Sequence, residues 1–308
     1  MNASHDQIPS LGVDKDPRYT ASAIAVVIVH FGDRNVTQCA IESVAKLSPP
    51  PGTIYVVNNG PGAWPPDDSP KVEILDRVDN SGYAGAVNTG ARAAIAANFD
   101  FVWILNNDVE VDSSSLAYFL EAYEEDPAVE ILGSYVVAED LCWFGGGDFS
   151  QRTGCASHVG YGLPFDNTKG SGCVATDWIN GCSMFIPVQS FAKRGWFDEF
   201  FFLYKEELEW QLRYPQVRAR IIRRPLVNHL VGASTGSSDS RLGRIFMARN
   251  GLILAMRQKG IRRAGWLSAW VFDYVCRPIA RFRWSALRDH VEGAMLIRVE
   301  PHVVLARL

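Results

Sequence analysis

The chain has 308 residues, of which 47% are hydrophobic and 21% are charged, and its formal net charge is −4. These values are ordinary for a globular protein and exclude the fibrous and disordered classes, and the length suffices for one large α/β domain with an appendage or for two small domains. Because the six cysteines form no Cys-x-x-Cys pair and no zinc-finger spacing, we expect neither a disulfide framework nor a structural zinc site, and a reducing cytoplasm fits best.

The charge is divided unevenly along the chain. Residues 241–308 hold 13 Lys and Arg against 4 Asp and Glu, a balance of +9, whereas the rest of the chain carries −13. Residues 1–20 are polar and lack the charged-then-apolar pattern of a secretion signal. We therefore expect a flexible N-terminal segment at 1–20, an α/β domain at 21–240 and a basic helical region at 241–308.

Short apolar runs alternate with helical patterns from residue 23 onward. The runs with the length and β-branched content of buried strands are 23–31, 53–57, 72–77 and 101–105. Residues 35–47 and 83–99 place small and apolar side chains at helical spacing. The repeated alternation predicts a Rossmann-like, mostly parallel central sheet with helices on its faces.

Polar segments follow three of these strands, at 30–33, 58–62 and 106–110. Because ligands of open α/β sheets bind beyond the carboxyl ends of the strands, we expect Asn58, Asn106 and Asp108 to converge on one crevice. Each end taken singly has a plainer explanation, since Asn, Asp and Gly favour turns. The three together favour a binding site.

Residues 79–90, DNSGYAGAVNTG, place Gly82 and Gly85 at the start of a predicted helix. Free N–H groups and the helix dipole suit a phosphate or a sugar hydroxyl there. The dinucleotide fingerprint Gly-x-Gly-x-x-Gly is absent after the first strand, and so is the phosphate-loop pattern with its Lys. The glycines alone therefore do not identify a ligand.

Seven segments between residues 23 and 260 together carry a family resemblance. They read VVIVHF, VVNNG, NSGYAGAVNTG, WILNNDVEVD, WINGCSMFI, GWFDEFFFLYKEELEWQLR and VNHLVGAST. In this order and at about this spacing they resemble family 2 glycosyltransferases, most closely the bacterial rhamnosyltransferase-like members. The resemblance implies a GT-A fold and an inverting transfer of a hexose or deoxyhexose, such as rhamnose, from a dTDP- or UDP-sugar to a glycan or lipid-linked acceptor, with a divalent cation, Mn or Mg.

The same resemblance assigns donor and metal roles. Asn106 and Asp108 stand at the two acidic positions of the family's Asp-x-Asp motif, which makes Asp108 the main metal ligand, Asn106 a contact to ribose or metal, and Glu110 a compensating acid. His229 matches a further metal ligand of some members, although a structural histidine is an equal alternative. Asn58 stands where many relatives carry an Asp that reads the nucleotide. The other residues assigned to donor binding are His30, Asn80, Gly82, Tyr83, Gly85, Asn88 and Asn107.

An inverting displacement needs a general base on the face of the sugar opposite the leaving group. Glu207 occupies the place of that base in a segment resembling the family's FFLYxED, and Glu206 is the backup. A solvated surface helix is the alternative for these acids, and it is favoured for Glu209, which stands four residues before Arg213. The preceding aromatic residues, FDEFFFLY, form either a cleft wall or plain core.

Residues 178–186 resemble the segment that lines the sugar pocket. The expected pocket residues are Trp178, Asn180, Gly181 and Cys182. Gly181 lets the backbone approach a ligand closely, while Trp178 either stacks on a sugar ring or is a buried structural residue. The Gly-rich stretch 141–172 lacks periodicity and predicts a long loop that shapes acceptor choice.

The basic region 241–308 carries two features. Residues 244–260 resemble a helix with an Arg-Asn pair in rhamnosyltransferase-like relatives, and residues 266–284 mix Trp, Phe and Arg. The longest uncharged run there, 264–272, is far below the ~20 residues of a spanning helix. The segment fits docking on an anionic membrane surface, and equally a helical cap or a homo-oligomer contact. We expect a cytoplasmic protein, peripheral at the inner face of the membrane, and no nucleic-acid partner, because no known module for one is present.

Two other functions stay open at this point. Asn58, Asn106 and Glu207 replace the usual carboxylates, which is compatible with a catalytically degenerate nucleotide-sugar-binding protein. A nucleotidyltransferase shares the sheet and the metal chemistry, but the segment after the first strand supplies its Gly-rich basic loop poorly.

Overall fold

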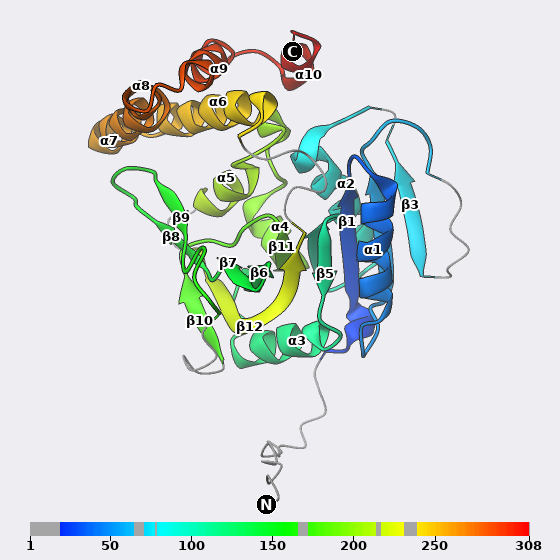
Figure 1. Cartoon of the computed structure of the whole chain (residues 1–308). Helices are drawn as coiled ribbons and strands as arrows, with labels where there is room; N and C mark the ends of the chain where they lie inside the picture. Colours follow the sequence, from blue (N-terminus) through cyan, green and yellow to red (C-terminus); the bar gives the residue numbers. More distant parts are fainter. Residues whose placement is uncertain are drawn as a thin grey trace, which may run out of the picture.

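The computed structural model of the protein describes residues 19–64, 71–77, 79–165, 172–213, 217–230 and 239–307. Its centre is a ten-stranded sheet with the order β10-β12-β6-β11-β4-β1-β2-β3, in which β5 also pairs with β12 and β7 with β6 (Figure 1). Nearly all of the expected flexible segment 1–20 lies outside the described residues.

The parallel half of the sheet matches the predicted alternation of strands and helices. Its elements are β1 Ile24–His30, α1 Arg34–Ala45, β2 Thr53–Asn58, β3 Val72–Asp76, α2 Gly82–Ala96 and β4 Phe101–Asn106. Every residue of β1 and β2 is buried, as expected of strands covered on both faces. The Asp33 side chain accepts a hydrogen bond from the Asn35 backbone N–H at 2.8 Å and so caps α1. The Rossmann-like, mostly parallel sheet of a GT-A fold is confirmed.

The second half of the sheet is mixed. Its elements are β5 Val109–Val111, α3 Ser115–Glu125, β6 Ile131–Ala138, β11 Ser183–Pro187, α4 Val188–Arg194, α5 Glu206–Leu212 and β12 Ala219–His229. Strand β11 runs antiparallel between β4 and β6, whereas β12 runs parallel to β6. This arrangement returns the chain to the carboxyl end of β4, where β5 pairs with the end of β12.

The stretch 141–172 contains short strands rather than the continuous loop that its composition predicts. They are β7 Leu141–Phe144, β8 Gly147–Phe149 and β9 Ala156–His158, with β10 Cys173–Thr176 following. β7 extends the main sheet, and β8 and β9 form a separate hairpin. Each strand is too short to show a two-residue periodicity, which is why the sequence pattern missed them. Residues 166–171 lie outside the described part of the chain.

Helices of the basic region form a layer at one end of the molecule, beside α5 and the β8–β9 hairpin (Figure 1). They are α6 Arg241–Arg257, α7 Gly260–Val271, α8 Arg277–Ala280, α9 Trp284–Met295 and α10 Pro301–Arg307, with a π-helical turn at Phe272–Cys276. α6 packs on α9 and, through Phe246, on Phe202. Over the described residues, none of the helices has both the length and the apolar character needed to cross a membrane.

The aromatic segment before α5 belongs to the core. Phe197 and Phe201 are buried in the main hydrophobic cluster, and Phe202 is buried in a second cluster with Ile245 and Phe246 of α6. Of the two expectations for this segment, plain core is therefore the one observed for these three rings.

Candidate functional site

The carboxyl ends of three strands meet at one edge of the sheet, as the sequence predicts. In the parallel register His30 lies beside Asn58, and Val29 lies beside Asn106. The backbone N–H of Asn106 donates to the Cys182 carbonyl at 3.0 Å, which joins this edge to the segment before β11.

Asp108 and His229 face each other at the end of β4. Val109 pairs with His229 in the β5–β12 ladder, and the Leu230 N–H donates to the Asp108 carbonyl at 2.8 Å. As a result, His229 Nε2 lies 3.3 Å from Asp108 Oδ1. The Asp108 side chain is 5% exposed and the His229 side chain 10% exposed. The β5–β12 pairing thus brings together two residues that are 121 positions apart in the sequence.

This pair fits a cation that is shared with a substrate. Among the described residues there is no group of three or more His, Cys, Asp or Glu that could hold a metal ion. Mg²⁺ in phosphoryl and diphosphate sites is commonly held by only one or two carboxylates together with the phosphate oxygens and water. Asp108 and His229 supply one oxygen and one nitrogen that lie 3.3 Å apart, so they suit an ion that takes its other ligands from a bound substrate and water.

Tyr83 connects Asp108 to the acids of α5. Its hydroxyl donates to the Gly181 carbonyl. Burial raises the pKa of Tyr83 well above its ordinary value, and the neighbouring carboxylates of Glu206, Glu207 and Asp108 raise it further. The contacts at Gly181 and Cys182 place these groups near one another: a Cβ at Gly181 would lie 3.5 Å from Tyr83 Oη and 3.7 Å from Glu207 Cγ, and the Asn106 N–H donates to the Cys182 carbonyl at 3.0 Å.

Gly181 lies between Tyr83 and Glu207. A Cβ at this position would sit 3.5 Å from Tyr83 Oη and 3.7 Å from Glu207 Cγ. Cys182 follows; its pKa is raised by burial and then by Asp108. Asn180 Oδ1 accepts from the Cys182 N–H at 2.8 Å and so fixes the turn. Three of the four expected pocket residues, Asn180, Gly181 and Cys182, are thus in the same cluster.

The acids at the start of α5, buried Glu206 and half-buried Glu207, lack full hydrogen bonding. One carboxyl oxygen of Glu206 and one of Glu207 have no hydrogen-bond partner in the part of the chain that the structure describes. Burial raises the pKa of both carboxyl groups, and their mutual repulsion adds to the rise for Glu206, whereas Lys205 opposes it. A carboxylate whose pKa is raised toward neutrality is a better proton acceptor than an ordinary surface Glu.

A turn with positive φ angles directly precedes Glu206 and Glu207 and sets the position of α5. Phe202, Tyr204 and Lys205 have φ angles of 63°, 66° and 69°, a region that costs non-glycine residues energy. The Asn250 amide of α6 holds the turn by donating to the carbonyls of Phe201, Leu203 and Tyr204 at 2.8, 2.9 and 2.8 Å. The side chain of Asn250 is fully buried, so these bonds are shielded from water.

Arg249, the neighbour of Asn250, is fully buried as well and ties the turn to the C-terminal helices. Its guanidinium donates to the Phe200 carbonyl at 2.9 Å, to Leu296 at 3.1 Å and to Val299 at 2.9 Å. Burial lowers its pKa to about 10, so it stays charged at neutral pH. In the sequence, the Arg-Asn pair was noted only as part of the family resemblance and was given no role. The residues around 249–250 do not identify the hydrogen-bond acceptors of this pair, which lie about 50 positions away along the chain.

The start of α2 is occupied by protein contacts. Gly82 has a φ of +71°, and a Cβ there would lie 2.3 Å from the Phe202 carbonyl oxygen. The Tyr83 N–H donates to that carbonyl at 2.7 Å, and the Gly82 N–H donates to Asn80 Oδ1 at 2.9 Å. A Cβ at Gly85 would lie 2.5 Å from Ser81 Cβ. The glycines therefore serve close packing, and the first two N–H groups are not available to a phosphate as the sequence reasoning expected.

Three residues expected to bind the donor or the sugar are instead committed to packing. Asn88 is fully buried and bonds Phe197 and Glu199 through both its amide atoms. Asn107 donates to Thr37 Oγ1 at 2.9 Å and to the Phe31 carbonyl at 3.1 Å. Trp178 is 4% exposed, and its Nε1 donates to the Asp148 carbonyl at 3.3 Å. Both amide atoms of Asn88 and the amide nitrogen of Asn107 are therefore used within the fold, and for Trp178 the buried structural residue is the alternative observed.

His30 and Asn58 are also bonded within the fold. His30 is 2% exposed, with Nδ1 2.7 Å from Thr37 Oγ1, and burial lowers its pKa to about 4. The Asn58 amide donates to the Gly62 carbonyl at 2.8 Å and to Asp76 Oδ1 at 2.6 Å. His30 is therefore assigned to packing, while Asn58 places the carboxylate of Asp76 at the end of β3, a neighbour that sequence reasoning missed.

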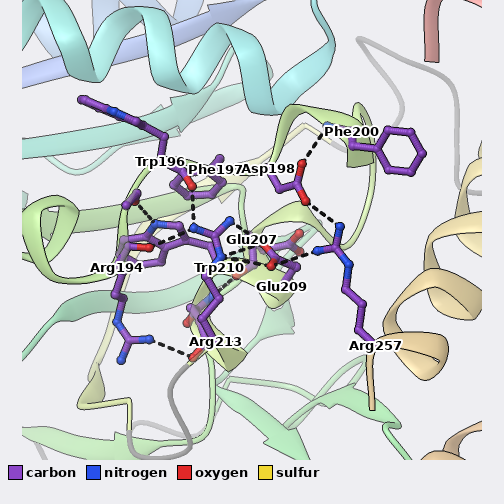
Figure 2. Close-up of polar contacts among 12 residues, drawn as sticks. Arg194, Trp196, Phe197, Asp198, Phe200, Glu207, Glu209, Trp210, Arg213 and Arg257 are labelled. Carbon is purple, nitrogen blue, oxygen red and sulfur yellow. Dashed lines mark hydrogen bonds and ion pairs between the residues drawn. The ribbon is translucent and has the colours of Figure 1, made fainter. Parts of the chain in front are cut away.

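Two further acids lie outside the cluster. Glu110, expected as a compensating acid, is exposed and lines a surface hollow with Glu42 of α1 and with Lys46, which follows α1. That expectation is corrected. Glu209 bonds Arg213 at 2.6 Å and Arg257 at 3.2 Å, and Figure 2 shows both cations converging on it. The predicted i,i+4 ion pair of Glu209 is confirmed, but the solvated surface helix expected with it is wrong, because Glu209 is only 8% exposed.

Two residues of the short-strand region lie beside the Asp108–His229 pair but were not expected there. The ring of Trp143 lies 4.5 Å from that of His229 and 4.9 Å from that of His158. His158 Nδ1 lies 3.0 Å from the Trp143 carbonyl, which makes it the protonated nitrogen, and Nε2 lies 3.3 Å from Asn180 Nδ2. Burial lowers the His158 pKa and His229 lowers it further. The sequence carries no signal for the contact of Trp143 with His229, because the pairing of strands far apart in the sequence brings these residues together.

Comparison with known proteins agrees with this fold. Residues 25–148 match the sequence model of the family described as Glycosyl transferase family 2. No curated protein matches the chain. Among solved structures, S. aureus TarS 1-349 has 12% identity and a TM-score of 0.55 over 92% of this chain and 82% of that one. The mannosyltransferase PcManGT from Pyrobaculum calidifontis in complex with GDP-Man and Mn²⁺ has 15% identity and a TM-score of 0.52 over 96% and 81%.

A third structure, GalNAc-T7 with UDP, GalNAc and Mn²⁺, has 12% identity and a TM-score of 0.53 and covers 84% of this chain, which spans 58% of that one. At these identities the structural likeness establishes the GT-A fold. The match to the Glycosyl transferase family 2 model is confined to residues 25–148, so membership of the whole chain in that family stays a prediction. The rhamnosyltransferase-like level stays a prediction.

Proposed function

We propose that the protein transfers a sugar from a nucleotide-sugar donor to an acceptor hydroxyl, with inversion at the anomeric carbon. The observation that carries the proposal is that the carboxyl end of β4 meets the start of α5 at Gly181 and Cys182: the Asn106 N–H donates to the Cys182 carbonyl at 3.0 Å, and a Cβ at Gly181 would lie 3.7 Å from Glu207 Cγ. One carboxylate has a histidine beside it and suits a cation, and the other two have raised pKa values that suit a proton acceptor. Sugar transfer needs both kinds of group close together.

Each residue has a role in this proposal. A Mn²⁺ or Mg²⁺ ion, held by Asp108 and His229 with Asn106 nearby, would neutralise the charge that develops on the leaving diphosphate. Glu207 removes the proton of the acceptor hydroxyl. Repulsion between the carboxylates of Glu206 and Glu207 disfavours their negative charge and so raises the proton affinity of the pair. Tyr83 and Gly181 fix the wall between the two ends of the site.

The donor and acceptor are assigned by argument from the sequence. We propose a dTDP- or UDP-activated hexose or deoxyhexose, with rhamnose the first choice, and a glycan or lipid-linked acceptor of cell-envelope polysaccharide synthesis. The basic helical region supports an acceptor at a membrane surface and hence a cytoplasmic, peripheral location. Asn58 and Asp76, bonded to each other at the end of β2 and β3, are the proposed contacts to the nucleoside.

A screen of nucleotide sugars by thermal unfolding tests the proposal. A ligand that binds only the folded state raises the melting temperature in proportion to occupancy, so one donor with Mn²⁺ should raise it and the same donor with a chelator should raise it less. Donor hydrolysis by the wild type, absent in Glu207→Gln, should follow. Failure of all nucleotide sugars to stabilise the protein would contradict the proposal.

A catalytically degenerate binder is the second candidate. It is favoured by Asn106, which leaves Asp108 as the one carboxylate of the former acidic pair. Tight donor binding without hydrolysis or transfer in the wild type, and identical behaviour of Glu207→Gln, would decide for this alternative.

A further inference from the structure

The turn between α8 and α9 exposes two aromatic side chains between arginines. Residues 281–284 read Arg-Phe-Arg-Trp. Phe282 has a φ of 53° and is 79% exposed, and Trp284 is 59% exposed. Helices that end in a left-handed residue usually have Gly or Asn there, because a bulky side chain is strained. No burial of the Phe282 ring compensates the strain within the described structure, so folding does not account for this residue.

Exposed apolar side chains continue along the preceding helical segment. Phe272 is 57% exposed and Ile279 is 43% exposed. We call Phe272, Ile279, Arg281, Phe282, Arg283 and Trp284 together the docking face. α8 and α9 lie on the side of α6 that is turned away from the central sheet (Figure 1), so the docking face is separate from the Asp108–Glu207 cluster.

A basic cavity adjoins this face. It has a volume of about 170 Å³, and its lining includes four arginines against two aspartates: Arg244, Arg277, Arg281, Arg283, Asp239 and Asp273. Arg283 bonds Asp239 at 2.6 Å, and Arg277 bonds Asp273 at 3.0 Å. Arg244 bonds Asp289 at 2.6 Å, so three of the four lining guanidinium groups are paired with carboxylates and Arg281 supplies the remaining positive charge. A planar guanidinium fork matches phosphate oxygens.

We propose that the docking face binds the surface of an anionic lipid bilayer, with the rings of Phe282 and Trp284 in the interfacial layer and the arginines on headgroup phosphates. Trp, Phe and Arg are the residues favoured at this boundary. Arginine and aromatic residues are enriched at protein interfaces as well, so the charge of the region, rather than its composition, selects the bilayer as the occupant. The +9 charge of residues 241–308 complements an anionic surface.

Vesicle co-sedimentation of the full chain tests this proposal. We expect binding to vesicles of phosphatidylcholine with phosphatidylglycerol, little binding to phosphatidylcholine alone, and a loss of binding at high salt. Arg281→Glu should weaken binding about 30-fold, since each charge near the surface contributes about fivefold. Phe282→Ala should weaken it at least tenfold through the lost apolar contact. Arg224→Glu, an exposed arginine that stacks on Tyr118 at the opposite end of the molecule, is the matched control and should bind like the wild type.

Three results would overturn the proposal. They are absence of binding to anionic vesicles, equal binding to both vesicle types, and loss of binding in Arg224→Glu as large as in Arg281→Glu. A concentration-dependent dimer in light scattering that Phe282→Ala dissolves, with vesicle binding unchanged, would assign the docking face to a second copy of this chain. Melting curves of each variant exclude unfolding as the cause. The assay uses no sugar donor, so its outcome is independent of the proposed transfer activity.

Discussion

Replacing Asn250 tests how the C-terminal helices support the site. In Asn250→Ala, the carbonyls of Phe201, Leu203 and Tyr204 lose their shared donor while staying buried. An unsatisfied buried polar group costs roughly 1–3 kcal/mol, and the amide has two hydrogens to lose, so we expect a loss of about 3 kcal/mol in the free energy of unfolding. For 308 residues the entropy of unfolding is about 0.65 kcal/mol/K, so that loss corresponds to a fall of roughly 5 °C in Tm.

The same change should affect catalysis more than binding. The turn with positive φ at Phe202, Tyr204 and Lys205 can relax once its amide donor is gone, and a shift of about 1 Å in a catalytic group costs roughly 10²-fold in rate. We therefore expect kcat to fall about 10²-fold. Nucleotide affinity should change less than about threefold, because Asp108 and His229 are held by the β5–β12 ladder and not by this turn.

Calorimetric melting, steady-state kinetics with the donor found by screening, and nucleotide titration provide the three readouts. Asn35→Ala, an exposed helical asparagine of α1, is the matched control and should change stability by less than about 0.5 kcal/mol. A fall in Tm of less than about 2 °C would refute the hydrogen-bond reasoning. A parallel loss of nucleotide affinity and kcat would refute the separation between the turn and the metal pair.

Three other changes test neighbouring parts of the site. Glu206→Gln should raise Tm near pH 8 but not near pH 4. The pKa of Glu206 in the folded protein is raised above 4.5, so the stability of the wild type falls as pH rises from the unfolded pKa through the folded one, and the amide removes that loss. Melting curves that shift equally at both pH values would contradict this. Asp108→Asn should abolish the Mn²⁺-dependent part of donor stabilisation in thermal unfolding while the apo protein melts within a few degrees of the wild type; full retention of the Mn²⁺ effect would exclude the ligand role. In denaturant unfolding, Gly82→Ala should destabilise the protein by about 2 kcal/mol more than Gly162→Ala does. Both glycines have a positive φ, but a Cβ at Gly82 would lie against the Phe202 carbonyl, whereas nothing lies within 4 Å of a Cβ at Gly162. Equal losses of stability would refute the contact.

The parallel half of the fold was predictable because its signals are local. Runs such as 23–31 are apolar throughout, and a strand buried on both faces requires that pattern whatever else the chain does. The convergence of Asn58, Asn106 and Asp108 on one edge follows from parallel pairing alone, since every carboxyl end points the same way. The short strands β7, β8 and β9 could not be predicted, because three or four residues carry no readable period.

The side-chain partners were the harder part of the site. Asn88 and Asn107 look like ligand-binding amides in sequence, yet their acceptors, Phe197 and Phe31, are supplied by other segments of the fold. The acceptors of the Asn250 amide likewise come from another segment, the turn before α5. An amide gives the same signal in a sequence whether it bonds a ligand or a carbonyl, and only the three-dimensional contacts distinguish the two.

The most direct test of the account compares Glu207→Gln with the wild type under single-turnover conditions, with the identified donor, Mn²⁺ and acceptor at saturation. Glu207 is proposed to take a proton only during transfer, so the variant should bind the donor with an affinity within about threefold of the wild type and lose roughly 10²–10⁴-fold in the rate of transfer. A variant that transfers sugar at the wild-type rate, or one that loses donor binding along with the rate, would contradict the placing of the general base in this cluster.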